Sequence, residues 1–102
     1  MTKVDQKAEY LKRELNSPFI NGKALKSILT GIYGISEAQT RALYRAMRAN
    51  SDRQLKAMGL IGFSYAVPAK IAFDYLSLLG ISKEKIIEDI DRMSEAEASA
   101  ND

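Results

Sequence analysis

The chain runs Leu29-Thr-Gly-Ile-Tyr-Gly-Ile-Ser-Glu-Ala-Gln-Thr-Arg-Ala-Leu43 at the point where one helix ends and the next begins. Gly34 suits the left-handed position that follows a helix, and Ile35 suits the apolar contact of that cap. Ser36 suits the N-cap of a new helix, with Gln39 at the reciprocal position. The same order recurs in Gly80-Ile81-Ser82. The sequence therefore predicts helices joined by tight turns.

Apolar residues elsewhere recur every three or four positions, which is the spacing of amphipathic helices. No segment alternates clearly enough for a strand. A helix from Ser36 is expected to end near residue 50, and a short one is expected to start at Ser51. We expect another helix from about Ser64 to Leu79. The predicted fold class is all-α, a compact bundle of five to six short helices. The predicted core is Leu11, Leu15, Leu25, Ile28, Leu29, Ile32, Leu43, Met47, Leu55, Ile71, Tyr75, Leu79, Ile86 and Ile90.

The length of 102 residues fits one small domain. We expect a single helical domain over 1–93 and a flexible acidic C-terminal tail over 94–102. The chain has no Cys and no His, which excludes the commonest zinc ligands, a catalytic thiol and an imidazole base. Glu84, Glu88 and Asp91 lie about one helical turn apart, and we interpret them as a solvent-exposed face rather than a metal site.

We therefore expect a protein that is not an enzyme and that holds no cofactor and no metal. No apolar run reaches the length of a membrane span, and the first residues lack the apolar region of a signal peptide. These features predict a cytoplasmic protein without a membrane partner.

Charge is distributed unevenly along the chain. Residues 1–73 contain twelve Lys or Arg and five acids, a net charge of +7, whereas 74–102 contain three and eight, a net charge of −5. Such asymmetry indicates a polarised surface with a basic face for an acidic partner. Two solvated faces that merely differ in charge are the simpler interpretation. A third arrangement has the acidic end folded back on the basic face, screening it.

Three arginines, Arg41, Arg45 and Arg48, are spaced by four and three residues and so lie along one side of a helix. Arg53 and Lys56 extend the positive charge toward the next segment. An arginine stripe suits carboxylate or phosphate contact, because the guanidinium donates two hydrogen bonds at once. Within the helix only Glu37 is spaced to pair with the stripe. An ordinary solvated face is the alternative.

The segment 59–66 is apolar although it lies between helices. It contains Leu60, Ile61, Phe63 and Tyr65, which are large for a loop. We expect these side chains to plug the core of the bundle. The alternative is an exposed contact patch in which Phe63 or Tyr65 anchors a partner.

The stretch 29–43 also resembles the helix-hairpin-helix element. Gly34, Ile35, Thr40 and Leu43 match its pattern, and Ser36 stands where the second glycine of the family belongs. The resemblance implies that Gly34, Ile35 and Ser36 hold a DNA phosphate through backbone amides, without reading bases. Ordinary capping accounts for the same residues.

Taken together, these patterns predict a non-catalytic regulatory or adaptor protein that binds another protein with an acidic surface. A nucleic-acid-binding module that uses the hairpin and the arginine stripe is the alternative. A self-assembling structural component is a second alternative. The predicted partner-binding residues are Arg41, Arg45, Arg48, Arg53, Lys56, Phe63 and Tyr65.

Overall fold

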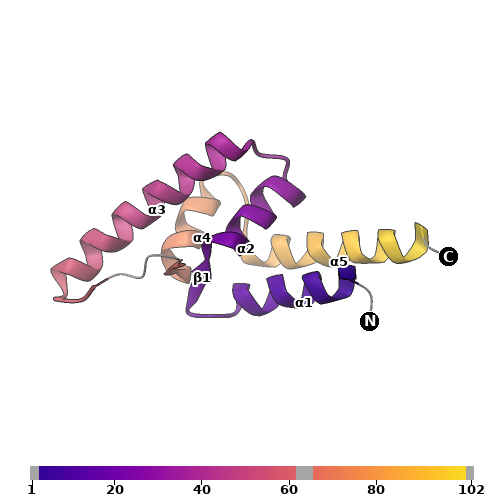
Figure 1. The fold of residues 1–102 in the computed structure, drawn as a ribbon, viewed down its shortest axis with the longest axis horizontal. Helices are drawn as coiled ribbons and strands as arrows, with labels where there is room; N and C mark the ends of the chain where they lie inside the picture. Colours follow the sequence, from indigo (N-terminus) through magenta and orange to yellow (C-terminus); the bar gives the residue numbers. More distant parts are fainter. Residues whose placement is uncertain (1–2, 62–65, 101–102) are drawn as a thin grey trace.

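The computed structural model describes residues 3–61 and 66–100, with side chains described over 6–61 and 66–95 (Figure 1). The described chain is mostly helical, as predicted, but a bundle of five to six short helices is not confirmed. The elements in chain order are α1 (Lys3–Leu15), β1 (Phe19–Asn21), α2 (Gly22–Lys26), η1 (Ser27–Ile32), α3 (Glu37–Ala57), β2 (Ala66–Pro68), α4 (Ala69–Ser77) and α5 (Lys83–Ala100).

A two-stranded antiparallel sheet joins distant parts of the chain, and the expectation of no strand was wrong. Phe19 pairs with Pro68 and Ile20 with Val67, and the two central side chains are fully buried. The amide of Ala69 extends the ladder by donating to the carbonyl of Pro18 at 2.9 Å. Strands of three residues are too short to produce a visible alternation, so their pairing depends on packing across the fold.

Helix α3 is one continuous element of 21 residues, where the sequence predicted two helices with a break near residue 50. Ser51, the predicted N-cap of the second, lies inside the helix and is buried. Gly and Pro are the two residues that most destabilise the interior of a helix, and neither occurs between Ser36 and Gly59. The helix therefore runs on until Gly59, which has a φ of +78°.

The repeated Gly-Ile-Ser turns have the predicted geometry. Gly34 has a φ of +66°, and the hydroxyl of Ser36 accepts a 3.2 Å hydrogen bond from the amide of Gln39. At the second copy Gly80 has a φ of +74°, and the amide of Ile81 donates to the carbonyl of Leu76 at 3.1 Å. Both turns thus pair a left-handed glycine with amides that satisfy the last carbonyls of the preceding helix.

The segment before the first of these turns is wider than the α-helix that its spacing predicts. Over Ser27–Ile32 the chain forms a π-helix, and the amide of Tyr33 accordingly reaches back five residues to the carbonyl of Ile28 at 3.3 Å. The hydroxyl of Thr30 donates to the carbonyl of Lys26 at 2.6 Å. Such widened turns are rare and occur often at functional sites.

The core agrees with the prediction at most positions and departs from it near the end of α4. Leu79 was expected inside but is 50% exposed, whereas Leu76 is fully buried. Helix α4 ends at Ser77, so Leu79 falls in the turn and no longer continues the buried face. Four other predicted core residues are only partly buried: Ile32, Leu43, Leu55 and Tyr75. Four buried side chains were not among the predicted core residues: Ile20, Val67, Leu76 and Ile81.

Helices α1 and α5 pack side by side in opposite directions, so that the two ends of the chain lie at one end of the molecule (Figure 1). Lys12 on α1 forms an ion pair with Asp91 on α5. The backbone of α5 stays helical to Ala100 and so includes residues 94–100, which we expected to form a tail; its flexibility stays a prediction. No helix in the described ranges is long and apolar enough to cross a membrane.

Asp89 is the polar centre of the α5 packing. Its side chain is 10% exposed and accepts a 2.7 Å hydrogen bond from the hydroxyl of Tyr33. Lys85 and Arg92 lie 3.5 and 3.2 Å from its oxygens. The Tyr33 hydrogen bond is the main cause that lowers the pKa of Asp89, aided by the two cations. Burial, together with the Asp89 carboxylate, raises the pKa of Tyr33.

Candidate partner-binding surface

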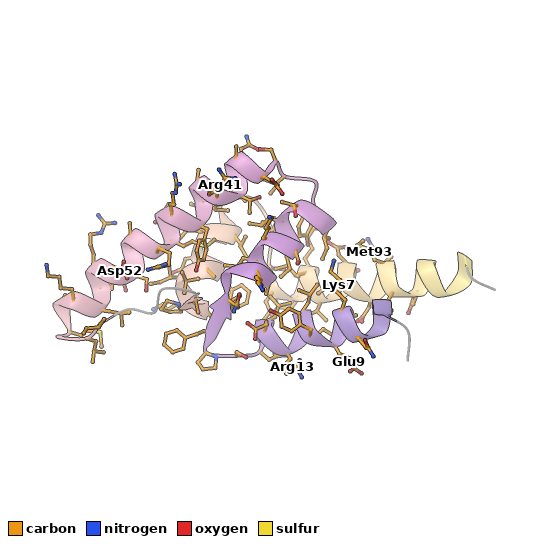
Figure 2. The ribbon with its side chains drawn as sticks, in the orientation of Figure 1. Lys7, Glu9, Arg13, Arg41, Asp52 and Met93 are labelled. Carbon is orange, nitrogen blue, oxygen red and sulfur yellow. The ribbon has the colours of Figure 1, made fainter. Side chains whose placement is uncertain are left out.

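The arginine stripe lies on the outer side of α3, as predicted for its first two members. Arg41 and Arg45 are exposed one turn apart, and nitrogen-tipped side chains extend outward along this helix, with Arg41 near its start (Figure 2). Within the described side chains no carboxylate forms an ion pair with either residue. Both guanidinium groups are therefore available to an external anion.

Arg48 differs from the other two arginines. Its side chain is only partly exposed, and its Nη2 atom lies 4.0 Å from Oδ2 of Asp52 on the next turn. The expectation that only Glu37 could pair with the stripe from within the helix was wrong, because the longer α3 also contains Asp52, and Glu37 itself pairs with Lys26 at 3.3 Å. Of the three arginines, Arg41 and Arg45 are thus available to a partner, whereas Arg48 is paired with Asp52 within α3.

Two further cations occupy the last turns of α3. Arg53 and Lys56 are exposed and have no ion pair among the described residues. At about 100° per residue, Lys56 lies only about 20° from the line of Arg45 around the helix, whereas Arg53 lies about 80° away. Lys56 therefore continues the stripe, and Arg53 stands beside it.

The turn after α3 exposes a cluster that we call the apolar tip: Met58, Leu60 and Ile61. Their exposed fractions are 70%, 53% and 92%. The amide of Leu60 donates to the carbonyl of Leu55 at 2.8 Å, which holds the turn against the helix end. The prediction that this segment plugs the core was wrong for Leu60 and Ile61. Phe63 and Tyr65 lie outside the described residues.

The tip stands clear of the rest of the described chain. The buried residues of α3 are Thr40, Met47 and Ser51, and none follows Ser51. Figure 1 shows this end of α3 and the far end of α5 at opposite extremes of the molecule. The basic helix and the acidic helix therefore point away from each other, and α5 does not fold back over the arginine stripe.

The hairpin at Gly34, Ile35 and Ser36 precedes this surface. The amide of Ile35 is used inside the turn, where it donates to the carbonyl of Leu29 at 2.9 Å. Glu37 occupies the first position of α3, where its carboxylate is stabilised by the positive end of the helix. A phosphate at this helix start would meet that carboxylate, so the hairpin is a less favourable anion site than the outer face of α3.

Metal binding has no support in the described part of the chain. No three acidic, His or Cys side chains there lie close enough to hold an ion. Of the acids considered from the sequence, Glu88 pairs with Arg92 at 3.1 Å and Asp91 pairs with Lys12.

Sequence reasoning identified the cations of α3 but did not single out Met58, which it placed in the short helix expected to start at Ser51. Its only signal was its position directly before Gly59, where the chain leaves the helix. No protein-family model matches the chain, and no curated protein or solved structure matches it either. Function must therefore be inferred from the chemistry of these surfaces.

Proposed function

We propose that the protein is a non-catalytic adaptor or regulatory protein that binds an acidic segment of another protein along α3. The observation that supports this most is the apolar tip, which lies next to the unpaired cations of the same helix end. Exposing three large apolar side chains to water at one turn is unfavourable, and covering them with a partner lowers the free energy of the complex.

The chemistry of this surface fits a two-part contact. Burying a large apolar side chain contributes about 1.5–3 kcal/mol, so Ile61 and Met58 supply anchoring energy. Arg45 and Lys56 attract a partner of opposite charge, and this raises the association rate and fixes orientation. The fitting partner is an amphipathic helix with an acidic face. At 21 residues α3 is about 31 Å long, and it offers such a helix several turns of contact.

The proposal is tested by comparing what immobilised variants capture from host lysate, with quantitative mass spectrometry as the readout. We expect Arg45→Glu and Ile61→Ser to lose the same proteins. Lys70→Glu is the matched control, because it reverses an exposed charge on α4. A photo-crosslinking residue at position 61 should then label an acidic segment of the protein that both variants lose. Identical capture by the wild type and both variants would overturn the proposal.

Nucleic acid is the second candidate partner. It is favoured by one observation, namely that α3 follows η1 after a four-residue turn containing Gly34 and exposes Arg41 and Arg45. A glycine turn followed by a helix with exposed basic side chains fits the alternative expected from the sequence, a nucleic-acid-binding module that uses the hairpin and the arginine stripe.

A titration of fluorescent duplex and single-stranded DNA separates the two candidates. Binding through phosphates should weaken steeply between about 50 and 200 mM salt, and Arg41→Ala should reduce the slope of that dependence by about one. Absence of DNA binding at the lower salt concentration would rule out nucleic acid and leave a protein as the remaining candidate partner.

A further inference from the structure

A groove lies between α1, η1 and α5, on elements that the proposed surface of α3 does not use. Its volume is about 240 Å³. Figure 2 shows the side chains of Lys7 and Met93 close together at this place, on the side of the two packed helices that faces η1. The groove is lined by Lys7, Ala8, Leu11, Ser27, Gly31, Ile32, Ile90, Met93 and Ser94.

The walls and the rim of the groove differ in chemistry. Leu11 and Ile90 are buried and form an apolar floor with Ile32. Among the described lining residues the polar ones are Lys7, Ser27 and Ser94, and none of them is acidic. Lys7 has no ion pair among the described side chains. A site of this kind matches an apolar chain that ends in a negative charge.

Gly31 indicates that the groove is not merely a gap left by imperfect packing. Its φ is not positive, and a Cβ atom added there would meet no atom within 4 Å. Neither the backbone nor close packing therefore requires glycine, although glycine destabilises a helical turn relative to alanine. The absence of a side chain at this point keeps the rim of the groove open. The π-helical form of η1 adds a second unusual feature to the same wall.

We propose that this groove binds a small amphipathic carboxylate, with its alkyl chain on the apolar floor and its carboxylate at Lys7. The volume of about 240 Å³ lies below the roughly 300–1,000 Å³ typical of sites for drug-sized molecules, so it suits a small ligand such as a medium-chain fatty acid. The site lies between α1, η1 and α5 and shares no residue with the surface proposed on α3.

Octanoate is the probe, and octanol is its uncharged control. We expect saturable octanoate binding by calorimetry, with a Kd of about 1 mM or tighter, together with shifts of the Gly31 and Ser27 amide signals in nuclear magnetic resonance spectra. Lys7→Met keeps the aliphatic stem and removes the charge. It should weaken octanoate binding roughly three- to tenfold and leave octanol binding unchanged.

Gly31→Leu fills the rim and should abolish binding of both probes. Because this larger side chain can also disturb η1, thermal unfolding of the free variant checks its fold. Lys7→Met provides the independent test at an exposed position. Lys70→Met, outside the groove, is the matched control and should bind octanoate like the wild type. Lack of saturation, or equal binding by wild type, Lys7→Met and Gly31→Leu, overturns the proposal. Equal affinity for octanoate and octanol overturns the assignment of a carboxylate.

Discussion

Replacing Leu76 by Ala tests the packing of α4 against the core. The Leu76 side chain is fully buried, and Leu to Ala at such sites costs about 2.7–5 kcal/mol, including the cavity left behind. A chain of this length has a free energy of unfolding of about 5–15 kcal/mol. This single substitution should therefore remove about a quarter to a half of the stability at the middle of that range.

Leu79→Ala is the matched control, because the same atoms are removed three residues later. Its side chain is 50% exposed, so only about half of the transfer energy is lost, about 1 kcal/mol, and no closed cavity forms. The two variants should differ by about 2 kcal/mol or more.

Urea unfolding followed by far-ultraviolet circular dichroism measures this difference directly. With the slope of a small protein, the unfolding midpoint of Leu76→Ala should lie about 1 M below that of Leu79→Ala. Both slopes should match the wild type, since the surface exposed on unfolding is nearly the same. Equal midpoints, or a lower midpoint for Leu79→Ala, would show that the register of α4 is misplaced by one turn.

Two further predictions concern glycine and pH. Gly80→Ala should lower the free energy of unfolding by about 1 kcal/mol, because the φ of Gly80 is positive. Gly31→Ala should raise it by about 0.5–1 kcal/mol, because Gly31 has a helical backbone with open space beside it. Thermal unfolding of both variants checks these opposite signs, and a lower stability of Gly31→Ala would contradict the placement of Gly31 at an open rim. Asp89 has a lowered pKa in the folded protein, so its stabilisation is present above about pH 4 and is lost as the pH falls further. Acid unfolding of Tyr33→Phe should therefore depend less on pH than that of the wild type, and Asp74→Asn, an exposed carboxylate, should not show this change.

The features that could be predicted from the sequence are those encoded within a few neighbouring residues. Gly34 and Ser36 supply a left-handed position and a cap without help from the rest of the fold, and their geometry is as expected. The exposure of Arg41 and Arg45 follows in the same way from their spacing on one helix.

The features that could not be predicted depend on distant segments meeting. The pairing of Ile20 with Val67 leaves no local pattern in three-residue strands. Leu79 carries the right spacing for the core, but helix α4 stops two residues before it. The groove at Lys7 needs three separate elements, and no single stretch of sequence contains its lining.

The arrangement of the paired elements has a consequence for the integrity of the protein. Elements before the apolar tip pair with elements after it: α1 packs on α5, β1 on β2 and α3 on α4. A backbone cut in the exposed turn at Gly59 would thus sever the covalent link and leave these buried contacts in place. Each half supplies part of the core: Leu25 and Ile28 lie before the turn, and Leu76 and Ile86 lie after it. The exposed turn at Gly59 is therefore the place where we expect the protein to be divisible into two fragments that associate with each other.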